Sequence, residues 1–518
     1  MNGVQLLLIV GVGIAVSALA RRRGVEPGLI IVVLAAAASF LPGVPRLELE
    51  PDLILAIVIP PLLYSATRGA SFSAFGANLH SIYTLGITLV LLTTGALGVI
   101  TTWLLPSIGA AAAFVLGAVL APPDTITTVS HGDEIGLPKR ATSILTGESL
   151  VNDVTALTLF TIAVAAVNGE HTGWARGVLE FLRNAVVGLA IGSALAVIVL
   201  WIRKRLGNPT LETSLVLLLP FTAFLAAEQA HASGILAVVA SAFSVSVNLS
   251  LDPKHQYPGA YRARLQEDAF WPVLDFLLET FVFAYIGLQL KFVLHDVADA
   301  KTLTRTLVTA GVLLVAAILI RMAGVYVLFG QWIMRLRLAE RRIARNPAYR
   351  AQFERRQQRS RRRGGKPMGP PTHKEIVLVG WTGMRGILTL AAAAAVPEHL
   401  PDGRDFPGRP EIQAIALFVT LGTLLIQGTT VRRVAGLLKF DLAADRAEEA
   451  EMRERGQTII AETAAEPSSD IDDGFERQRL ALGRAVAEHH VTEEVARELI
   501  EDIDLRQAAR HTGDPARP

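Results

Sequence analysis

The chain contains about thirteen separate apolar runs, each long enough to cross the roughly 30 Å hydrocarbon layer of a membrane as an α-helix. Inside that layer, backbone amides and carbonyls need hydrogen bonds within the protein, and a helix supplies them from its own turns. Hydrophobic residues make up 51% of the 518 residues, and charged residues only 19%. The sequence therefore predicts an all-α polytopic membrane protein whose surroundings are the lipid bilayer.

The first apolar run has two interpretations. It ends in Ala-Leu-Ala just before Arg21, Arg22 and Arg23, as a cleaved signal peptide can. However, no basic residue precedes the run and the arginines follow it, which favours a retained helix. The predicted spans lie near residues 3–20, 28–43, 52–67, 83–106, 110–130 (broken), 141–167, 184–202, 213–229, 233–249, 270–290, 306–332, 375–397 and 411–430.

The loops between these spans differ strongly in their content of Lys and Arg. If the odd-numbered loops are cytoplasmic, they hold a large excess of basic residues, and such an excess sets the topology. The largest share comes from a basic loop at about 333–374, whose composition also suits binding to anionic lipid head groups. We therefore expect a multi-pass protein of the cell membrane with its N-terminus outside and its C-terminus in the cytoplasm.

The composition changes near residue 440. Residues 1–439 are predicted to form a transmembrane domain, and residues 440–518 a polar, acidic cytoplasmic tail. Within the tail, AAEPSSDIDDG has the composition of a disordered segment, and residues 475–510 have the pattern of one amphipathic helix. The tail is either a solvated helix without a ligand or a regulatory or dimer-stabilising element, and its sequence identifies no partner.

Polar residues interrupt the apolar pattern most clearly between Ala121 and Asp153. Pro122 and Pro123 end the preceding helix, so Asp124 follows a break. The next span carries four polar residues within an arc of about 140°, which makes one polar helix face. Charged groups at membrane depth are costly and indicate function. The four residues are Glu148, Ser149, Asn152 and Asp153.

Each acidic residue in this stretch also has a purely structural interpretation. Asp124 could cap a half-helix by accepting from amides that the prolines leave free. Glu148 could belong to an ion pair, and Asp153 could be a buried carboxylate neutralised by hydrogen bonds. Asn152 argues against the last alternative, because an amide beside a carboxylate keeps a site polar without adding a second charge.

The twelfth span is interrupted as well. Gly380, Gly383 and Gly386, together with Met384 and Arg385, break its apolar pattern. Helices broken at corresponding positions of two halves indicate a midplane transport site built from inverted repeats. The halves share no sequence identity, so the two breaks alone support this prediction.

The chemistry of cation and proton exchange matches these residues. An exchanger needs an acid whose pKa lies near the working pH, so that proton and cation compete for it, and we expect Asp153 to be that acid. Ser149, one turn earlier, and backbone carbonyls at the Pro122–Asp124 break add oxygen ligands that suit hard ions such as Na⁺ and Li⁺. A monovalent cation site is therefore predicted at Asp153 and Ser149, with Asp124 and Pro123 beside it.

Five strings of the sequence resemble segments of one protein family, in the same order. GAVLAPPDT and LTGESLVND are similar to the paired signatures of NhaP/NHE-like sodium/proton antiporters, which belong to the monovalent cation:proton antiporters. AAEQAHASGILAVV, LETFVFAYIGLQL and GWTGMRGILTLAAAAAVP are similar to further segments of these proteins. The resemblance covers residues 1 to 440, approximately, and thus the whole of the predicted transmembrane domain.

The resemblance implies a fold and a set of residue roles. The fold has a core domain, in which two broken helices cross, and a separate dimerisation domain, so a homodimer is expected. The aspartate of the Asn-Asp pair, here Asp153, carries the ion and the proton in turn, and Asn152 helps to orient the site. The same resemblance pairs Glu148 with Arg385 in a structural ion pair.

Two further positions have a secondary interest in the light of the resemblance. Many relatives carry an acidic residue shortly after the Pro-Pro of the third span, where this chain has Ser65. A hydroxyl can still ligate a cation, but the site has lost a charge, which leaves the ion preference open. Glu279 matches an acidic position of the resembling exchangers, with a structural or pH-sensing role.

The predicted function is exchange of a monovalent cation, Na⁺ or Li⁺, for H⁺ by alternating access, in pH and sodium homeostasis. One carboxylate that exchanges one proton for one cation moves no net charge, so transport should be electroneutral. Asn152 supports this, because it stands where electrogenic relatives have a second aspartate. The sequence does not set the affinity, the pH range or the physiological direction.

Three alternatives remain open on sequence grounds. They are K⁺/H⁺ exchange by the same fold, a passive cation channel, and an intramembrane hydrolase that uses either Asp124 and Asp153 together or Ser149 as a nucleophile. A hydrolase needs a base and an oxyanion arrangement, and the chain has no GxSxG or HExxH motif. We therefore expect a secondary transporter and not an enzyme. No cofactor is expected because no nucleotide motif is visible, no nucleic-acid partner is expected either, and the absence of cysteine excludes thiolate metal sites.

Overall fold

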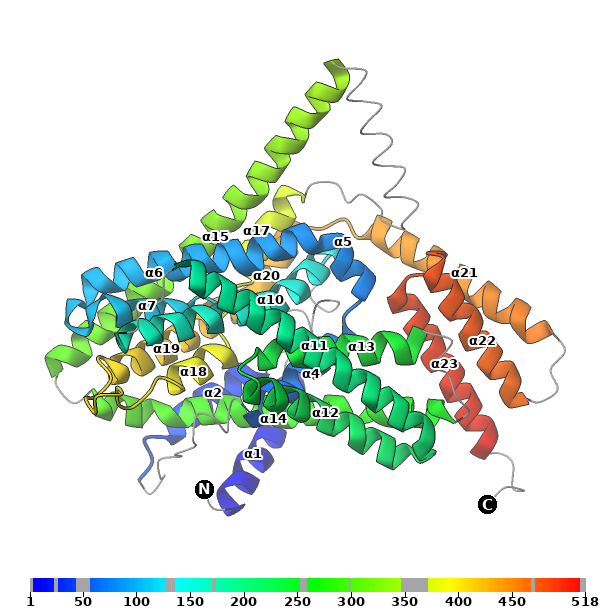
Figure 1. Cartoon of the computed structure of the whole chain (residues 1–518), viewed down its shortest axis with the longest axis horizontal. Coiled ribbons are helices and arrows are strands. Elements are labelled where there is room, and N and C mark those ends of the chain that lie inside the picture. Colours follow the sequence, from blue (N-terminus) through cyan, green and yellow to red (C-terminus); the bar gives the residue numbers. More distant parts are fainter. Residues whose placement is uncertain are drawn as a thin grey trace.

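The structure is a computed structural model that describes residues 3–22, 27–42, 56–125, 132, 136–169, 174–251, 259–297, 300–345, 371–466 and 471–512. These ranges are helical, and within them β pairing is limited to isolated bridges between Asp124 and Met384 and between His399 and Asp405. The helices form a layered bundle with the C-terminal helices at one end (Figure 1). The prediction of an all-helical protein is confirmed for this part of the chain.

Seven helices in the described ranges are long and apolar enough to cross a membrane, and each coincides with a predicted span. One is a continuous helix made of α5 (Phe72–Tyr83), the π-helical turn η1 (Thr84–Leu89) and α6 (Val90–Leu104). Another joins α19 (Arg409–Thr423), η4 (Leu424–Gly428) and α20 (Thr429–Leu438). The other five are α10 (Lys139–Val167), α11 (Trp174–Leu206), α12 (Pro209–Gln229), α14 (Ala260–Asp296) and α15 (Ala300–Arg345).

The remaining predicted spans coincide with shorter helices. Apolar stretches of α1, α2, α7 and α13 are shorter than a full crossing, and α4 and the pair α17 and α18 account for the spans at 52–67 and 375–397. The bounds are α1 Gly3–Arg22, α2 Pro27–Ala38, α4 Ile59–Gly69, η2 Pro106–Ile108, α7 Gly109–Leu120, α13 Gly234–Leu251, α17 His373–Trp381 and α18 Ile387–Ala394.

Local sequence signals explain where several helices begin and end. Thr372 and Glu375 form a capping box that starts α17: the Thr372 hydroxyl accepts from the Glu375 amide, and the Glu375 carboxylate accepts from the Thr372 amide. Asn208 caps α12 in front of Pro209. α7 ends at Leu120, just before Pro122, because proline offers no amide to continue the helix.

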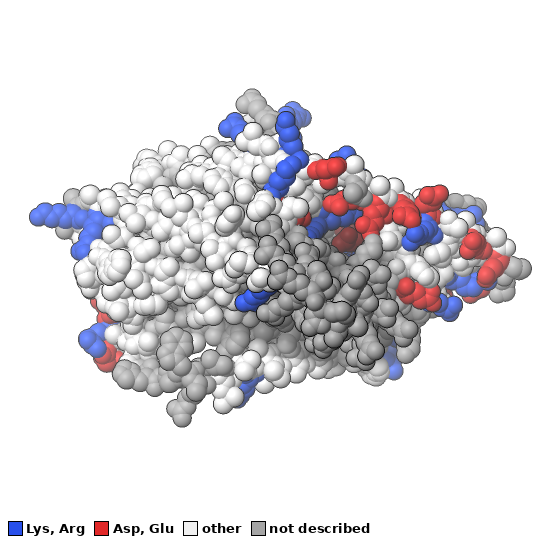
Figure 2. Space-filling model, turned by 90° about the horizontal axis from the view of Figure 1, so that it is seen from above, with Lys and Arg blue, Asp and Glu red and all other residues white. Residues whose placement is uncertain are grey.

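The helix α7 lies at the centre of the largest apolar core. Val115, Leu116, Val119 and Leu120 are fully buried there, packed among residues of α6, α15 and α19. By contrast, large apolar side chains such as Trp103 (78% exposed) lie on the outside of the bundle. Figure 2 shows one such face, on which the charged side chains gather near the C-terminal helices, at the opposite end and along one edge. Such an apolar exterior is expected of helices that face lipid.

Two helices continue well beyond the predicted spans at 270–290 and 306–332. The helix α14 has 37 residues and α15 has 46, and α15 projects from the bundle (Figure 1). Polar residues at the ends of both helices can be solvated outside the membrane, so hydropathy underestimates helix length. The centre of the predicted basic loop, residues 346–370, lies outside the described residues.

The C-terminal tail contains three helices and not the single predicted one. They are α21 (Ala443–Ala465), α22 (Ile471–Ala487) and α23 (Glu493–Thr512). The chain reverses between α22 and α23, where His489 has a positive φ of 60° and the His490 amide donates back to the Ala485 carbonyl. The predicted helix at 475–510 is therefore two helices, packed through a core that includes Leu482, Leu499 and Ile503.

The segment predicted to be disordered, residues 464–474, is helical at both of its ends. Its first two residues end α21 and its last four begin α22, while residues 467–470 lie outside the described residues. Asp472 and Asp473, which suggested disorder by composition, stand in the first turn of α22, where acidic side chains stabilise a helix.

Buried charges attach the three C-terminal helices to the bundle. Asp504 of α23 accepts from Nε of Arg264 in α14 at 2.7 Å and from Nε of Arg479 in α22 at 2.7 Å, and all three side chains are buried. Arg497 donates to the Arg68 carbonyl at the end of α4. These contacts join the tail to α14 and to α4, and α4 is one of the helices that line the site described next.

Candidate functional site

Two helix breaks cross at the centre of the bundle. The chain leaves α7 at Leu120 and is not helical through Thr125, and it leaves α17 at Trp381 and is not helical until α18 starts at Ile387. At the crossing, the Asp124 amide donates to the Met384 carbonyl at 2.6 Å, so the two extended segments pair as one antiparallel bridge. Both predicted breaks are thus helix interruptions, and they touch.

The crossing requires a glycine at position 386. A Cβ atom built on Gly386 would lie 1.7 Å from Oδ2 of Asp124, which is far inside van der Waals contact. Since Asp124 is paired through its own backbone, it cannot retreat without losing the bridge to Met384. The missing side chain at Gly386 therefore lets the Asp124 carboxylate sit at the break.

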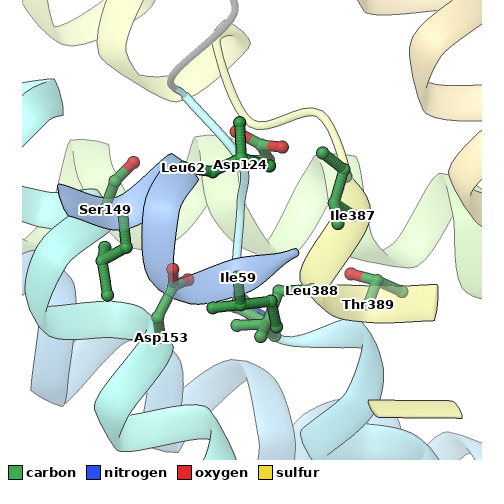
Figure 3. A pocket seen from close by; sticks show the side chains of 11 residues that line it. Ile59, Leu62, Asp124, Ser149, Asp153, Ile387, Leu388 and Thr389 are labelled. Atoms are coloured by element: carbon green, nitrogen blue, oxygen red, sulfur yellow. The ribbon is translucent and has the colours of Figure 1, made fainter. Parts of the chain in front are cut away.

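A cavity of about 60 Å³ lies beside the crossing (Figure 3). It has room for a small cation with one or two water molecules, since a single water needs at least about 10–15 Å³. Asp124 reaches it from the first break, and Ser149 and Asp153 from α10. Its lining residues are Ile59, Leu62, Leu63, Pro122, Asp124, Ser149, Asp153, Gly386, Ile387, Leu388 and Thr389.

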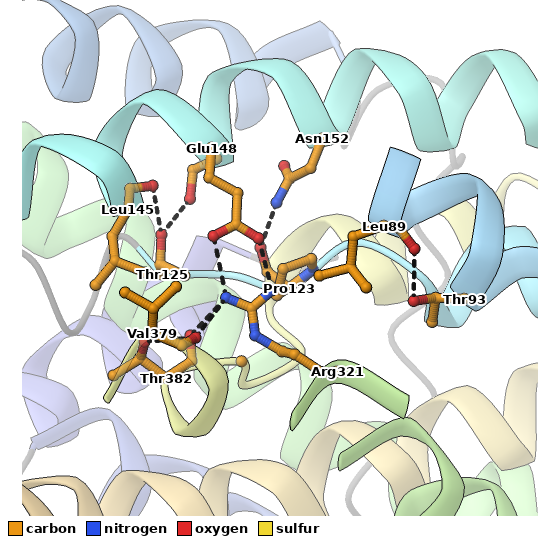
Figure 4. A network of polar contacts seen from close by, with 12 residues as sticks. Leu89, Thr93, Pro123, Thr125, Leu145, Glu148, Asn152, Arg321, Val379 and Thr382 are labelled. Atoms are coloured by element: carbon orange, nitrogen blue, oxygen red, sulfur yellow. Dashed lines mark hydrogen bonds and ion pairs between the residues drawn. The ribbon is translucent and has the colours of Figure 1, made fainter. Parts of the chain in front are cut away.

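The polar residues of α10 form two stripes and not the single face that the sequence predicted. Ser149 and Asp153, four residues apart, line the cavity. Glu148 and Asn152, also four apart, stand about 100° around the helix and are fully buried on another side, in a polar network (Figure 4). The first stripe meets the cavity, and the second holds the fold around it.

The Ser149 hydroxyl is oriented by its neighbour Thr125. The Thr125 hydroxyl donates to the Leu145 carbonyl at 2.9 Å and lies 2.5 Å from the Ser149 hydroxyl. Because the single proton of Thr125 is directed to Leu145, Ser149 donates to Thr125 and keeps its lone pairs for another ligand. The arrangement leaves an oxygen of Ser149 suited to a cation.

Glu148 pairs with Arg321 and not with Arg385 as predicted. Nη1 of Arg321 in α15 lies 2.6 Å from Oε1 of Glu148, and Nη2 lies 3.0 Å from Oε2 (Figure 4). The same guanidinium donates to the Val379 carbonyl at 3.0 Å, near the C-terminal end of α17. Gly383 permits this approach, because a Cβ there would meet the Arg321 side chain at 2.1 Å.

Arg385 has a different function at the crossing. Its Nε donates to the Leu120 carbonyl at 2.8 Å, at the C-terminal end of α7, and its Nη1 donates to the Gly383 carbonyl. Its backbone amide donates to the Thr423 hydroxyl of α19. Each broken helix thus ends against an arginine, which offsets the partial negative charge of its free carbonyls.

Asn152 and Pro123 contact each other directly. The Asn152 side-chain amide donates to the Pro123 carbonyl at 2.9 Å, which ties α10 to the first break. Both belong to the packed side of α10: Pro123 lies with Glu148, Arg321 and Arg385 around a space too small for water. Pro123 and Asn152 therefore do not line the cavity, and the neighbouring residues Pro122 and Asp153 do.

Ser65 and Glu279 lie outside the cavity lining. The Ser65 hydroxyl of α4 donates to Oδ2 of Asp275 in α14 at 2.5 Å. Leu62, one turn earlier on α4, lines the cavity, so this half-buried pair lies one helical turn away from it. The acidic group missing at Ser65 is thus present on the facing helix. Glu279 follows one turn later on α14, half-buried.

Four functional candidates escaped the sequence analysis. Thr125, Arg321, Asp275 and Thr389 carry no distinctive spacing, and each is defined by a neighbour far away in the chain. Arg321 bonds both the end of α17 and Glu148, and the pairing with Glu148 was not predicted. An arginine within an apolar span was the available signal for it.

The chemical content of the site is that of a carrier of small cations. Two carboxylates and hydroxyl oxygens meet in a cavity of atomic size between two broken helices, and the described residues contain no group of three His, Asp or Glu side chains that would hold a resident metal ion. The bundle and this cavity define a multi-pass membrane transporter. The family of that transporter follows from comparison with known proteins.

The sodium/hydrogen exchanger family, in its transmembrane part, matches residues 3–436, and the chain belongs to this family. It is therefore a monovalent cation/H⁺ antiporter, a secondary transporter and not an enzyme. An uncharacterized Na⁺/H⁺ exchanger of Mycobacterium tuberculosis is 29% identical over 97% of this chain and 94% of its own length. A sodium, potassium, lithium and rubidium/H⁺ antiporter of Bacillus pumilus is 28% identical over 78% of this chain and 56% of its own length.

A solved structure has the same fold. The sodium proton antiporter MjNhaP1 from Methanocaldococcus jannaschii superposes with a TM-score of 0.60, covering 84% of this chain and 98% of that protein, at 16% sequence identity. The sequence resemblance to NhaP-like antiporters is thus confirmed at the level of family and fold.

Proposed function

We propose that the protein exchanges one Na⁺ or Li⁺ for one H⁺, with Asp153 as the group that binds the cation and the proton in turn. The observation that carries this proposal is the cavity that Asp153, Asp124 and Ser149 line together at the crossing of two broken helices. Asp124 supplies the second carboxylate and Ser149 a hydroxyl oxygen, so the cation is held by oxygen atoms only. When a proton binds to Asp153, the carboxylate becomes neutral and no longer attracts the cation, so the two ions cannot bind at the same time.

The choice of cation depends on the size of the site. A small cavity with two carboxylates favours a small cation with a high charge density, which supports Na⁺ and Li⁺ over K⁺. K⁺/H⁺ exchange is the alternative, since the relative from Bacillus pumilus is named for sodium, potassium, lithium and rubidium. A series of cations at equal concentration separates the two.

The proposed exchange is electroneutral. In the network around Asp153, Glu148 is matched by Arg321, and Asn152 is uncharged. If Asp153 alone changes its occupant in a cycle, one positive charge crosses in each direction. A current that accompanies cation-driven proton flux in voltage-clamped vesicles would contradict this stoichiometry.

The wider arrangement is proposed from the same observations. Thirteen transmembrane helices, inverted repeats around the two crossing breaks, and separate core and dimerisation domains would allow alternating access in a homodimer. Residues 1–439 would form this membrane domain and residues 440–518 a cytoplasmic domain, with the N-terminus outside the cell membrane. Such a protein would serve pH and sodium homeostasis.

Purified protein in liposomes with a proton-sensitive dye inside tests the function. A pH gradient is imposed, and Na⁺, Li⁺, K⁺ or choline is added to the wild type and to Asp153→Asn. Na⁺ and Li⁺ should dissipate the gradient in the wild type, choline should not, and Asp153→Asn should lose the response to every cation. Glu411→Gln, on a half-buried acidic position at the start of α19 that does not line the cavity, is a matched control that should keep the response.

Two outcomes would contradict the proposal. If exchange persisted in Asp153→Asn, another acidic residue would have to carry the proton, and Asp124 would be the first candidate. If the folded wild-type protein responded to no cation, the proposal of cation/proton exchange at this site would be wrong.

A further inference from the structure

The hydroxyl of Thr389 has no hydrogen-bond partner among the described residues, although the side chain is only 1% exposed. Thr389 lines the same cavity as Asp124, Ser149 and Asp153, and it comes from α18, the helix that follows the second break (Figure 3). A buried hydroxyl without a partner is costly. Its place in the lining of a cavity that two carboxylates also line indicates a ligand that is exchanged during function.

The helix break explains why this hydroxyl is unpaired. Threonine in a helix usually donates to the carbonyl four residues earlier, as Thr93 does to Leu89, Thr101 to Leu97 and Thr155 to Val151. Thr389 is the third residue of α18, so the carbonyl four residues earlier belongs to Arg385 in the extended segment. The helical carbonyl that would normally accept its proton is not there.

We propose that Thr389 is a ligand of the transported cation and helps to select among cations by size. Its oxygen adds a donor from α18 to those of Asp124 at the first break and of Ser149 and Asp153 on α10. The cation would then be held between three separate segments. This inference rests on the proposed exchange at Asp153 and adds the contribution of the second broken helix.

Selectivity follows from this geometry. Oxygen atoms on three packed segments set the size of the shell, and removing one leaves a gap that only water or a larger ion can fill. Loss of the Thr389 hydroxyl should therefore weaken the binding of Na⁺ and Li⁺ more than the binding of K⁺. The methyl group of threonine keeps its contacts if the side chain becomes valine.

The test compares the KM for Na⁺, Li⁺ and K⁺ in liposomes for the wild type, Thr389→Val, Thr389→Ser and Thr420→Val. Thr420 is the matched control, because it is fully buried with an unpartnered hydroxyl but does not line the cavity. Thr389→Val should raise the KM for Na⁺ about five- to tenfold, the effect of losing about 1 kcal/mol of binding. Thr389→Ser and Thr420→Val should stay close to the wild type.

The outcomes are separable from those of the proposed function. A wild type without exchange overturns the function of the site as a whole. A wild type that exchanges, together with an unchanged KM for every cation in Thr389→Val, overturns only the role of Thr389. A Thr389→Val protein that loses maximal rate and thermal stability at an unchanged KM also overturns it, because that result assigns a purely structural role.

Discussion

Glu148 and Arg321 form a buried, two-pronged ion pair between helices α10 and α15, with N–O distances of 2.6 and 3.0 Å. The pair adjoins the cavity without facing it, and Arg321 also binds a carbonyl near the end of the broken helix α17. It thereby links the helix that carries Asp153 to one of the two breaks. This link fixes the position of α10 relative to the break that follows α17.

A double-mutant cycle should detect this pairing. Arg321→Gln leaves the Glu148 charge buried without its partner, which should lower the free energy of unfolding by about 3–5 kcal/mol. Glu148→Gln and Arg321→Gln should show a coupling of about 1–3 kcal/mol, measured by unfolding in mixed detergent micelles. Glu148→Gln and Arg385→Gln should show much weaker coupling, and the reverse order would refute the assignment.

Gly386→Ala should impair transport while leaving the protein folded. The added Cβ would displace the Asp124 carboxylate, and a displacement of about 1 Å at a reacting group can cost about a hundredfold in rate. We expect exchange to fall about 10- to 100-fold in the liposome assay. Gly311→Ala in α15 is the control, since nothing lies within 4 Å of a Cβ there, and equal losses in both variants would contradict the prediction.

Moving the carboxylate across the contact between Ser65 and Asp275 should be tolerated. Ser65→Asp combined with Asp275→Ser keeps one carboxylate and one hydroxyl at hydrogen-bond distance between α4 and α14. Asp275→Ser alone should raise the KM for Na⁺ about tenfold, and the double variant should return it to near the wild-type value. A double variant as impaired as the single one would argue that only the position on α14 matters.

Asp504→Ala should release the C-terminal helices from the bundle. The change leaves Arg264 and Arg479 buried without their shared carboxylate, at a cost of about 3–5 kcal/mol. Hydrogen exchange should then rise throughout α21 to α23. Asp502→Ala, on an exposed position of the same helix, should leave the hydrogen exchange of these helices unchanged. A similar rise of hydrogen exchange in both variants would contradict the role of Asp504.

The attachment of the tail should weaken slightly as pH rises. Burial raises the pKa of Glu501, and so do Asp268 of α14 and the acidic neighbours Asp502, Glu498 and Asp504. The attached state therefore binds more protons than the detached state, so attachment is favoured at low pH and is lost as pH rises above the ordinary glutamate pKa of about 4.3. Glu501 is largely exposed, so the effect is small and salt-sensitive.

Glu501→Gln should flatten this pH dependence. The measurement is protease sensitivity of the tail between pH 4 and pH 8, approximately, at low and high salt. Glu488→Gln, an exposed residue in the turn after α22, is the control and should keep the wild-type profile. A wild-type profile that is already flat would show that Glu501 does not control the attachment.

The membrane spans and the two breaks were predictable because their signals are local. An apolar run specifies a helix in lipid wherever its neighbours lie, and Pro122 with Pro123 ends a helix by removing amides. The same holds for Asp124, Ser149 and Asp153, which line one cavity: a break and a four-residue spacing are readable along the chain. The tail was less predictable, since a short turn at residues 488–492, in which His489 has a positive φ, divides it.

The partners of these residues were decided only by the tertiary structure. Whether Glu148 meets Arg321 or Arg385 depends on the rotation of α10 against α15, and the two residues of the pair are 173 positions apart. The contact of Ser65 with Asp275 spans 210 positions. The Thr389 hydroxyl has no partner among the described residues, and the chain before α18 is not helical. The sequence by itself determined the helices, the breaks and the acids between them. Packing decided which face of each helix met which, because hydrogen bonds and ion pairs act over about 3 Å and no periodic pattern along the chain encodes such distances.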